Sequence, residues 1–204
     1  NYKEISKLYT KTGKEYYLPH TVNPDLGYIF GLKESDGRED LVLFNTDIRI
    51  LSKIQNIISK LTNRIPKIKQ CSWNNTCYYT ALSSELLKNL FGKIKENILE
   101  VSDEVKFAIL AGYLDGDGSL TVITKRGKPW LKRIVFSTSE ISHREYLLYL
   151  LLSLGFKPKI HDYKNYNYHE IYLTYLDDKQ KFLNNAKESV KVFNFDKKVK
   201  LGIK

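Results

Sequence analysis

Methionine is absent from the 204-residue sequence, cysteine occurs only twice, and no long apolar run is present. A chain without an initiating methionine is expected to be a processed product, a fragment or a domain cut from a longer protein. Without a run of about 18 apolar residues no membrane helix is expected, and no signal-peptide pattern opens the chain. Cys71 and Cys77 have no histidine nearby, which argues against zinc and favours reduced, partly buried thiols. These absences indicate an intracellular protein of the cytoplasm, nucleoid or an organelle matrix, with no membrane partner.

Acidic residues are also few relative to basic ones. The chain has 33 lysines and arginines against 23 aspartates and glutamates, a net charge of +10. An excess of this size favours a polyanionic partner, nucleic acid first and an acidic membrane second, with a merely soluble basic protein as the alternative. Hydrophobic residues make up 42% of the sequence, which is enough for a packed interior. The length allows one substantial domain or two small halves that share a core.

The most informative stretch is Leu110-Ala-Gly-Tyr-Leu-Asp-Gly-Asp-Gly118, in which a helix of small and apolar residues ends in acids and glycines. A stretch 81 positions earlier repeats its spacing of small residues and its final Asp-Gly. Small residues at every fourth position form a smooth face of a helix, along which another backbone can approach closely. The matched pairs are Gly27 with Ala108, Gly31 with Gly112, Ser35 with Gly116, Asp36 with Asp117, and Gly37 with Gly118.

Both copies continue with the same predicted elements. Asn23-Pro24-Asp25 and Ser102-Asp103-Glu104 are typical starts of a helix. After each motif helix, periodicity predicts an amphipathic helix, two strands and a last helix. In the first copy these lie at about 47–61, from 66, at about 77–82 and at about 83–95; in the second they lie at about 140–154, from 158, at about 169–175 and at about 177–190.

The second copy has an additional predicted hairpin, with strands 120–125 and 130–137. Only seven residues separate Asp36 from Phe44, so the corresponding hairpin of the first copy is reduced to one strand. Residues 1–20 either supply the missing strand or wrap the surface. We therefore predict an α+β fold of pseudo-two-fold duplicated α-β-β-α-β-β-α units with two antiparallel sheets. Its predicted parts are an N-terminal extension (1–22), a degenerate first repeat (23–100) and a second repeat (101–204).

The acids of the motif are open to several chemical interpretations. A calcium loop with Gly118 at its sixth position would place Tyr113 and Thr124 where carboxylates are required, so an EF-hand is excluded. A dinucleotide fold is unsupported because the glycines follow a helix and do not open one. Docked motif helices would bring Asp36 and Asp117 together, and two such carboxylates repel unless a cation such as Mg²⁺ neutralises them. A metal held there can activate water for phosphodiester cleavage; the alternative is a pair of capping aspartates without chemistry.

On these residues the sequence resembles the LAGLIDADG homing endonucleases. The stretch that ends at Gly118 matches the family signature strongly, and Ile29-Phe-Gly-Leu-Lys-Glu-Ser-Asp-Gly37 matches it weakly, with Phe30, Lys33 and Glu34 departing from the pattern. The resemblance implies a monomeric two-repeat protein whose sheets form a saddle over the major groove of a long double-stranded DNA site. It implies that Mg²⁺, or another divalent cation such as Mn²⁺, binds at the ends of the motif helices. The predicted metal-site residues are Ser35, Asp36, Gly116 and Asp117.

The resemblance also implies a basic residue near each cleavage position, reached from the segment after the last helix of each repeat. The matching segments are 93–95 and 197–200, from which we select Lys95 and Lys198 as catalytic candidates beside Asp36 and Asp117. The alternative for each lysine is an ordinary solvated surface charge.

Basic side chains on the predicted strands favour DNA binding. Alternate residues of a strand share one face, and lysine, arginine and histidine on such a face can bind phosphates or read base edges. A solvated sheet face is the alternative. His143 is interpreted as a surface or packing residue, and Trp73 and Trp130 as structural. The predicted DNA-binding residues are Lys67, Lys69, Lys125, Arg126, Lys132, Arg133, Lys157, Lys159, His161 and Tyr172.

The leading hypothesis is a metal-dependent, site-specific double-strand DNA endonuclease, encoded within an intron or an intein. The weak first motif leaves two alternatives open: a maturase that assists splicing of its host intron RNA, and a relative that binds DNA without cutting it. An endonuclease domain excised from an intein is a third possibility, although no splicing-type terminus is visible.

Overall fold

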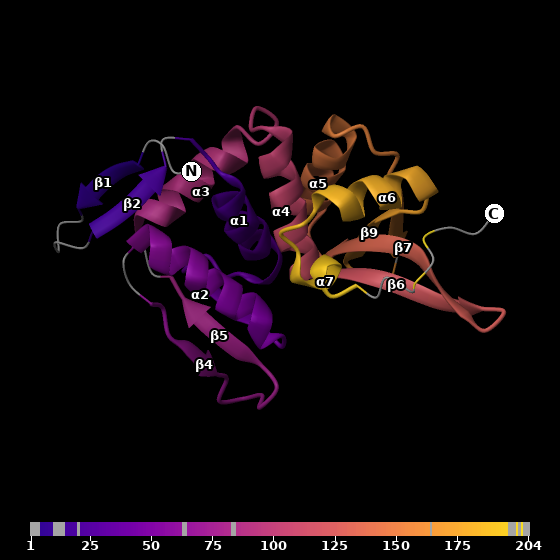
Figure 1. Cartoon of the computed structure of the whole chain (residues 1–204), viewed down its shortest axis with the longest axis horizontal. Helices are drawn as coiled ribbons and strands as arrows, with labels where there is room; N and C mark the ends of the chain where they lie inside the picture. Colours follow the sequence, from indigo (N-terminus) through magenta and orange to yellow (C-terminus); the bar gives the residue numbers. More distant parts are fainter. Residues whose placement is uncertain are drawn as a thin grey trace.

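The computed structural model describes residues 5–9, 15–19, 21–62, 65–82, 85–163, 165–195, 199 and 201. The first half has a β-hairpin followed by a unit of helices and strands, and the second half has a larger unit of helices and strands (Figure 1). The elements of the first half are β1 (Ile5–Tyr9), β2 (Glu15–Pro19), α1 (Pro24–Asp36), β3 (Val42–Asn45), α2 (Ile48–Thr62), β4 (Ile68–Gln70), β5 (Tyr78–Ala81) and α3 (Glu85–Glu96). Those of the second half are α4 (Asp103–Asp115), β6 (Gly118–Lys125), β7 (Lys128–Thr138), α5 (Ile141–Ser153), β8 (Lys159–Tyr163), β9 (Tyr168–Leu173), α6 (Leu176–Asn185) and α7 (Val190–Phe193).

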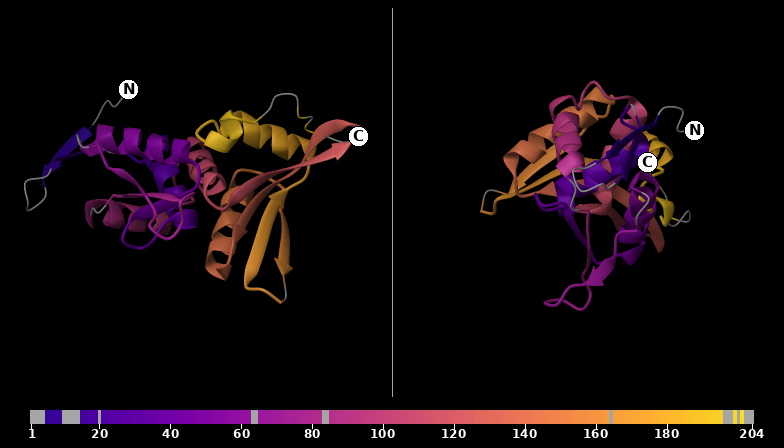
Figure 2. Two further views of the ribbon diagram at one scale, coloured as in Figure 1. Left: turned by 90° about the horizontal axis from the view of Figure 1, so that it is seen from below. Right: turned by 90° about the vertical axis from the view of Figure 1, so that its left-hand side faces the viewer.

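The predicted α+β class with two antiparallel sheets is confirmed. The first sheet has the strand order β3-β5-β4 and the second has the order β6-β7-β9-β8. The paired helices α1 and α4 lie between these sheets, and helices of each half cover its sheet (Figures 1 and 2). The first sheet is one strand smaller because only β3 stands where the second half has the hairpin β6–β7. Of the two possibilities for the N-terminal segment, β1 and β2 pair with each other and add no strand to the β3-β5-β4 sheet.

The prediction of a single helix at 177–190 is wrong. Helix α6 ends at Asn185, and the short helix α7 begins at Val190. Ser189 starts the new helix, since its side chain accepts a hydrogen bond from the backbone N–H of Val192 at 3.1 Å. The carboxylate of Asp115, which lies 74 positions earlier in the chain, accepts a second bond from the Ser189 hydroxyl at 2.6 Å. The break is therefore determined by a long-range contact that local periodicity does not contain.

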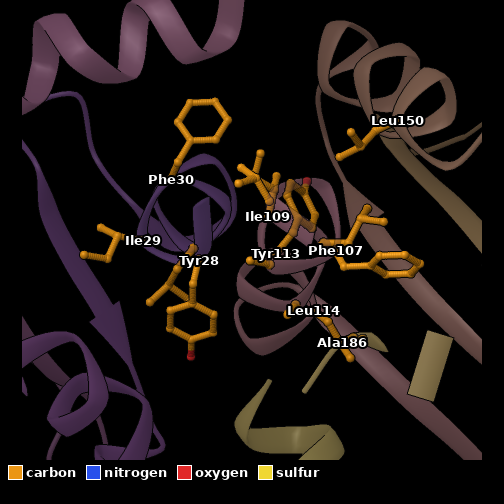
Figure 3. Close-up of a cluster of buried hydrophobic side chains, with 14 of the residues drawn as sticks. Tyr28, Ile29, Phe30, Phe107, Ile109, Tyr113, Leu114, Leu150 and Ala186 are labelled. Atoms are coloured by element: carbon orange, nitrogen blue, oxygen red, sulfur yellow. The ribbon is translucent and has the colours of Figure 1, made fainter. Parts of the chain in front are cut away.

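The centre of the molecule is the packing of α1 against α4. Asn23 and Ser102 cap the two helices, as predicted, by accepting hydrogen bonds from Leu26 N (2.9 Å) and Val105 N (3.4 Å). Both helices are apolar almost all round and buried, which is typical of helices inside a core. Buried hydrophobic side chains fill the space beside them, and those labelled in Figure 3 are Tyr28, Ile29, Phe30, Phe107, Ile109, Tyr113, Leu114, Leu150 and Ala186.

Two glycines allow these helices to touch. A methyl group at Gly31 would overlap the backbone carbonyl of Ile109, and one at Gly112 would overlap the carbonyl of Tyr28. The predicted smooth faces are therefore in direct backbone contact. Along the part of the chain that the structure describes, every helix is too short or too polar to span a lipid bilayer.

Candidate active site

Asp36 and Asp117 lie together where the two central helices end. Asp36 is the last residue of α1, and Asp117 lies in the turn after α4. Burial, the charge of Asp117 and a hydrogen bond to it raise the pKa of Asp36 to about 7. Lost hydration also raises the pKa of Asp117, although the hydrogen bond from Asp36 and the charges of Lys191 and His143 oppose that rise. The pair therefore holds a proton that isolated aspartates would release near pH 4.

The oxygen atoms around this pair suit a hard divalent cation. Two carboxylates with raised pKa values form a concentration of negative charge that a cation would relieve. Mg²⁺ commonly takes one or two carboxylates and completes its shell with phosphate and water. Among the described residues no group of three or more His, Cys, Asp or Glu side chains could hold a metal alone. Two carboxylates would leave coordination positions of such a cation open to other oxygen ligands, and among the described residues they do not form a closed metal site.

Asn45 fixes the orientation of Asp36. Its amide nitrogen donates to Asp36 Oδ2 at 2.9 Å and to the backbone carbonyl of Asp115 at 3.3 Å. Asn45 is the last residue of β3, so the first sheet holds the end of α1 and the end of α4 with one side chain. A cavity of about 340 Å³ opens beside it, lined by Asp36, Phe44, Asn45, Thr46, Asp47, Cys77, Asp115, Gly116 and Lys191.

Lys191 is a basic residue whose charge acts on both aspartates, and sequence reasoning missed it. Its ammonium group donates to the carbonyls of Leu114 (2.7 Å), Gly116 (3.0 Å) and Gly118 (2.7 Å) at the end of α4. A cation at a helix C-terminus is favoured by the helix dipole. Burial lowers the pKa of Lys191, and the carboxylates of Asp115, Asp36 and Asp117 oppose that shift. The sequence around Lys191 carries no signal for this role, because the cap at Ser189 depends on the distant carboxylate of Asp115.

Asp115 positions Lys191 by accepting hydrogen bonds from the start of α7. Its buried carboxylate accepts hydrogen bonds from the Ser189 hydroxyl (2.6 Å), from the backbone N–H groups of Val190 (2.6 Å) and Lys191 (2.9 Å), and from the Tyr28 hydroxyl (2.7 Å). These bonds cap α7 and hold it against α4. Burial, together with the charge and hydrogen bond of Asp115, raises the pKa of Tyr28 well above its usual value, so Tyr28 remains a donor.

The catalytic candidates Lys95 and Lys198 differ in outcome. The Lys95 ammonium pairs with Glu34 at 2.9 Å, and among the described residues no ion pair joins it to Asp36 or Asp117. Lys198 lies outside the described residues. Of the metal-site candidates, Ser35 donates its hydroxyl to the carbonyls of its own helix at Leu32 (3.0 Å) and Gly31 (3.3 Å).

Glu34 joins the two halves, because it contacts residues of both. This buried carboxylate contacts Lys33 (2.6 Å), Lys95 (2.9 Å) and His143 Nε2 (3.4 Å). Burial alone would raise the pKa of Glu34, but hydrogen bonds from His143, Lys33 and Lys95 outweigh it and hold that pKa far below its usual value. His143 therefore belongs to a polar network between the halves, in addition to packing at the surface of α5.

Most of the predicted DNA-binding residues lie on strands or hairpin turns of the two sheets, whereas Lys67 and Lys157 lie just before β4 and β8. Lys67, Lys69, Lys125, Arg126, Lys132, Lys157, Lys159 and His161 are exposed. The register pairs Lys159 with Tyr172 and His161 with Glu170, so these side chains share the uncovered face of the second sheet.

Two positions on this sheet differ from a simple alternation. Lys132 is the extra residue of a β-bulge, because Thr121 pairs with Arg133 and Val122 pairs with Leu131. Arg133 is half-buried, lies 3.3 Å from the carboxylate of Glu170 and covers the ring of Tyr172 at 5.2 Å. Part of the basic face is thus already paired with an acid that the sequence reasoning did not include.

Three comparisons relate the chain to known proteins. Residues 104–188 match the family model described as a LAGLIDADG-like domain. No curated protein matches the sequence significantly. The fold is similar to that of the homing endonuclease I-DmoI in mesophilic variants (TM-score 0.62, 21% identity, 81% of this chain and 96% of that chain) and in complex with DNA and Mn (TM-score 0.62, 21% identity, 81% and 97%). It is also similar to full-length DUF199/WhiA from Thermatoga maritima (TM-score 0.58, 15% identity, 88% of this chain and 61% of that chain).

Proposed function

We propose that this chain, which carries a LAGLIDADG-like domain in its second half and has the fold of the homing endonuclease I-DmoI, is a site-specific double-strand DNA endonuclease. The observation that carries the proposal is the aspartate pair at the ends of α1 and α4, between two sheets with basic uncovered faces. The complex of I-DmoI with DNA and Mn supports the same partner and a divalent cation here.

The side chains divide the work of cleavage. Asp36 and Asp117 would hold the cation once their shared proton is lost, and the amide of Asn45 fixes the carboxylate of Asp36. Mg²⁺ or Mn²⁺ at this position supplies an activated water and charge stabilisation for phosphodiester hydrolysis. Lys191 holds the carbonyls at the end of α4 in place and adds positive charge near the phosphate. We propose that Lys95 contributes to this process indirectly, by pairing with the carboxylate of Glu34.

The protein is proposed to bind a long DNA site as a monomer, with its two sheets contacting opposite halves of that site. The proposed parts remain an extension at 1–22, a first repeat at 23–100 and a second repeat at 101–204. Because one sheet has three strands and the other has four, the two halves of the target are expected to differ in sequence. Exposed lysines at Lys67, Lys69, Lys125 and Lys159 would bind phosphates, while Arg133, His161 and Tyr172 face the groove.

A second candidate function is DNA binding without cleavage. The ion pair between Lys95 and Glu34 favours it, because it engages a lysine that was a candidate for catalysis. Among the described residues, Lys191 is then the lysine whose charge acts on the aspartate pair. Under this alternative the aspartates would only terminate the two helices.

A cleavage screen distinguishes these functions. The protein is incubated with a plasmid library of random inserts in Mg²⁺, in Mn²⁺ or in EDTA, and linearised plasmids are sequenced at their ends. We expect one family of sequences to be cut with either cation, and no cutting in EDTA or by Asp36→Asn and Asp117→Asn. Asp177→Asn, an exposed acid at the start of α6, is the matched control that should keep activity. Specific binding by every variant without any cutting would favour the second candidate, and absence of both binding and cutting would reject the two together.

A further inference from the structure

The two cysteines flank the loop between β4 and β5, one directly after β4 and the other directly before β5; Figure 1 shows this loop. The strand register pairs Gln70 with Tyr78, so the next residues, Cys71 and Cys77, stand opposite each other. The backbone N–H of Cys71 donates to the carbonyl of Cys77 at 2.8 Å. Directly opposed residues of antiparallel strands have Cα atoms roughly 4.5–5.5 Å apart. That distance falls within the range of about 4.4–6.8 Å that a disulfide requires.

The side chains also face each other. Both cysteines are free thiols, and the chain contains no other cysteine. Burial, followed by a hydrogen bond to Cys77, raises the pKa of the Cys71 thiol to about 11. The half-buried Cys77 thiol is the more exposed of the two and donates to the carbonyl of Tyr78 at 3.7 Å. A disulfide within one chain therefore has a single pairing, for which the backbone is already arranged.

The pair joins an exposed loop to the candidate active site. Residues 72–76 are exposed, and Trp73 packs on the ring of Phe44 at 5.8 Å. On the other side, Cys77 lines the cavity that also contains Asp36. Tyr78, the next residue, pairs with Asn45, which holds the Asp36 carboxylate. A bond between the two sulfur atoms would fix the end of the hairpin from which this arrangement extends.

We propose that Cys71 and Cys77 are a redox modification site that forms a reversible intrachain disulfide with a small-molecule disulfide, such as oxidised glutathione, as the oxidant. The Cys77 thiolate attacks one sulfur of the oxidant, and one glutathione thiolate leaves. Cys71 then loses its proton and attacks the Cys77 sulfur, which releases the second glutathione. Two protein thiols are oxidised to one disulfide, and the oxidant is reduced to two thiols. The site does not depend on the proposed cleavage activity.

A redox titration of the full chain tests the proposal. The folded protein is equilibrated with mixtures of reduced and oxidised glutathione, remaining thiols are alkylated, and the intact mass is measured. We expect a monomer that is lighter than the reduced chain by two hydrogen atoms, carries no alkyl group and returns to the reduced mass with dithiothreitol. Cys71→Ser and Cys77→Ser are matched controls that should give at most a glutathione adduct.

A parallel titration in guanidinium chloride shows whether the fold prepares the pair. We expect the folded chain to form the disulfide at an oxidised fraction about tenfold lower than the unfolded chain, because the opposed backbone positions favour closure. A glutathione adduct that never closes, dimers joined between chains, or a folded chain that needs stronger oxidation than the unfolded one would each overturn the proposal.

Discussion

Replacing Gly112 by alanine tests the backbone contact on which the whole site depends. The added methyl group would overlap the carbonyl oxygen of Tyr28 and approach Leu32 N to 2.8 Å. These neighbours are backbone atoms of a buried helix, so they cannot rotate away and α1 must move from α4. Overpacking of this kind typically costs about 1–3 kcal/mol or more, whereas alanine gains about 1 kcal/mol over glycine as a helix former. We expect a net loss of about 2 kcal/mol, which is the upper end of this difference, because the obstruction is backbone.

Gly92 provides the matched control for this substitution. It is exposed within α3, and a methyl group there would meet no atom within 4 Å. Gly92→Ala should therefore show the helix-forming gain alone, about 1 kcal/mol. For a chain of this size each kcal/mol shifts the melting temperature by about 2–4 °C. Thermal unfolding followed by circular dichroism should give a decrease of roughly 4–8 °C for Gly112→Ala and an increase of about 2–4 °C for Gly92→Ala.

Equal increases in melting temperature for both variants would refute the close packing of α1 on α4. A decrease for both would show that the helix-forming gain is not what the control measures. If Gly112→Ala folds, DNA cleavage at a temperature well below its melting point gives a second readout. Displaced helix ends would separate Asp36 from Asp117 and lower cleavage further than the unfolded fraction explains.

Three other predictions concern the charges of the site. The pKa of Asp36 is raised from 3.8 to about 7, so its contribution to stability is complete below pH 4 and is lost as the pH rises through 7. Three pKa units correspond to about 4 kcal/mol, but solvent around the exposed Asp117 screens the repulsion between the two carboxylates. In EDTA at pH 8 we therefore expect Asp36→Asn to have a free energy of unfolding about 1–2 kcal/mol higher than the parent. An unchanged melting temperature would contradict the mutual repulsion. Lys191→Met should leave three carbonyls without their donor and destabilise the chain by about 1–3 kcal/mol, and a denaturant midpoint equal to the parent's would show that water replaces the ammonium group. DNA affinity should fall steeply with salt, by about one power of ten in the association constant per tenfold salt for each phosphate contact, and a flat response in a fluorescence anisotropy titration would reject the basic sheet faces as the DNA surface.

Much of the architecture was predictable because its signals are local. Asn23 and Ser102 mark the helix starts, the spacing of Gly31 and Gly112 marks the helix contact, and strand periodicity marks the hairpins. The end of α6 was not predictable, since the new start at Ser189 depends on a carboxylate from α4. The pairing of β1 with β2 was likewise undetermined, because a strand of that composition fits either a sheet edge or a separate hairpin.

In the candidate site, the positions of the acidic residues were more predictable than those of the basic residues. Asp36 and Asp117 are placed by the helix ends, so their proximity follows from the spacing of the glycines. A lysine reaches its site on a long flexible side chain, and its location depends on how the C-terminal segment folds back. Lys191 contacts residues more than 70 positions earlier in the sequence, and no local pattern distinguishes it from the other lysines of that segment.

The departures of the weak motif are better explained as compensation than as decay. Glu34 stands where the strong motif has Asp115, and each is a buried acid that organises basic or donor groups: Asp115 caps α7, while Glu34 contacts Lys95 and His143. Restoring the aspartate by Glu34→Asp would shorten the side chain by one methylene and leave partners of a buried carboxylate unmatched. We expect this variant to lose about 1–3 kcal/mol, measured as a lower denaturant midpoint, and to lose more than Glu39→Asp in the exposed turn after α1. A stabilised Glu34→Asp variant would mean that the first motif departs from the signature without compensation. The polar network around Glu34 would then not contribute to holding Asp36 and Asp117 together.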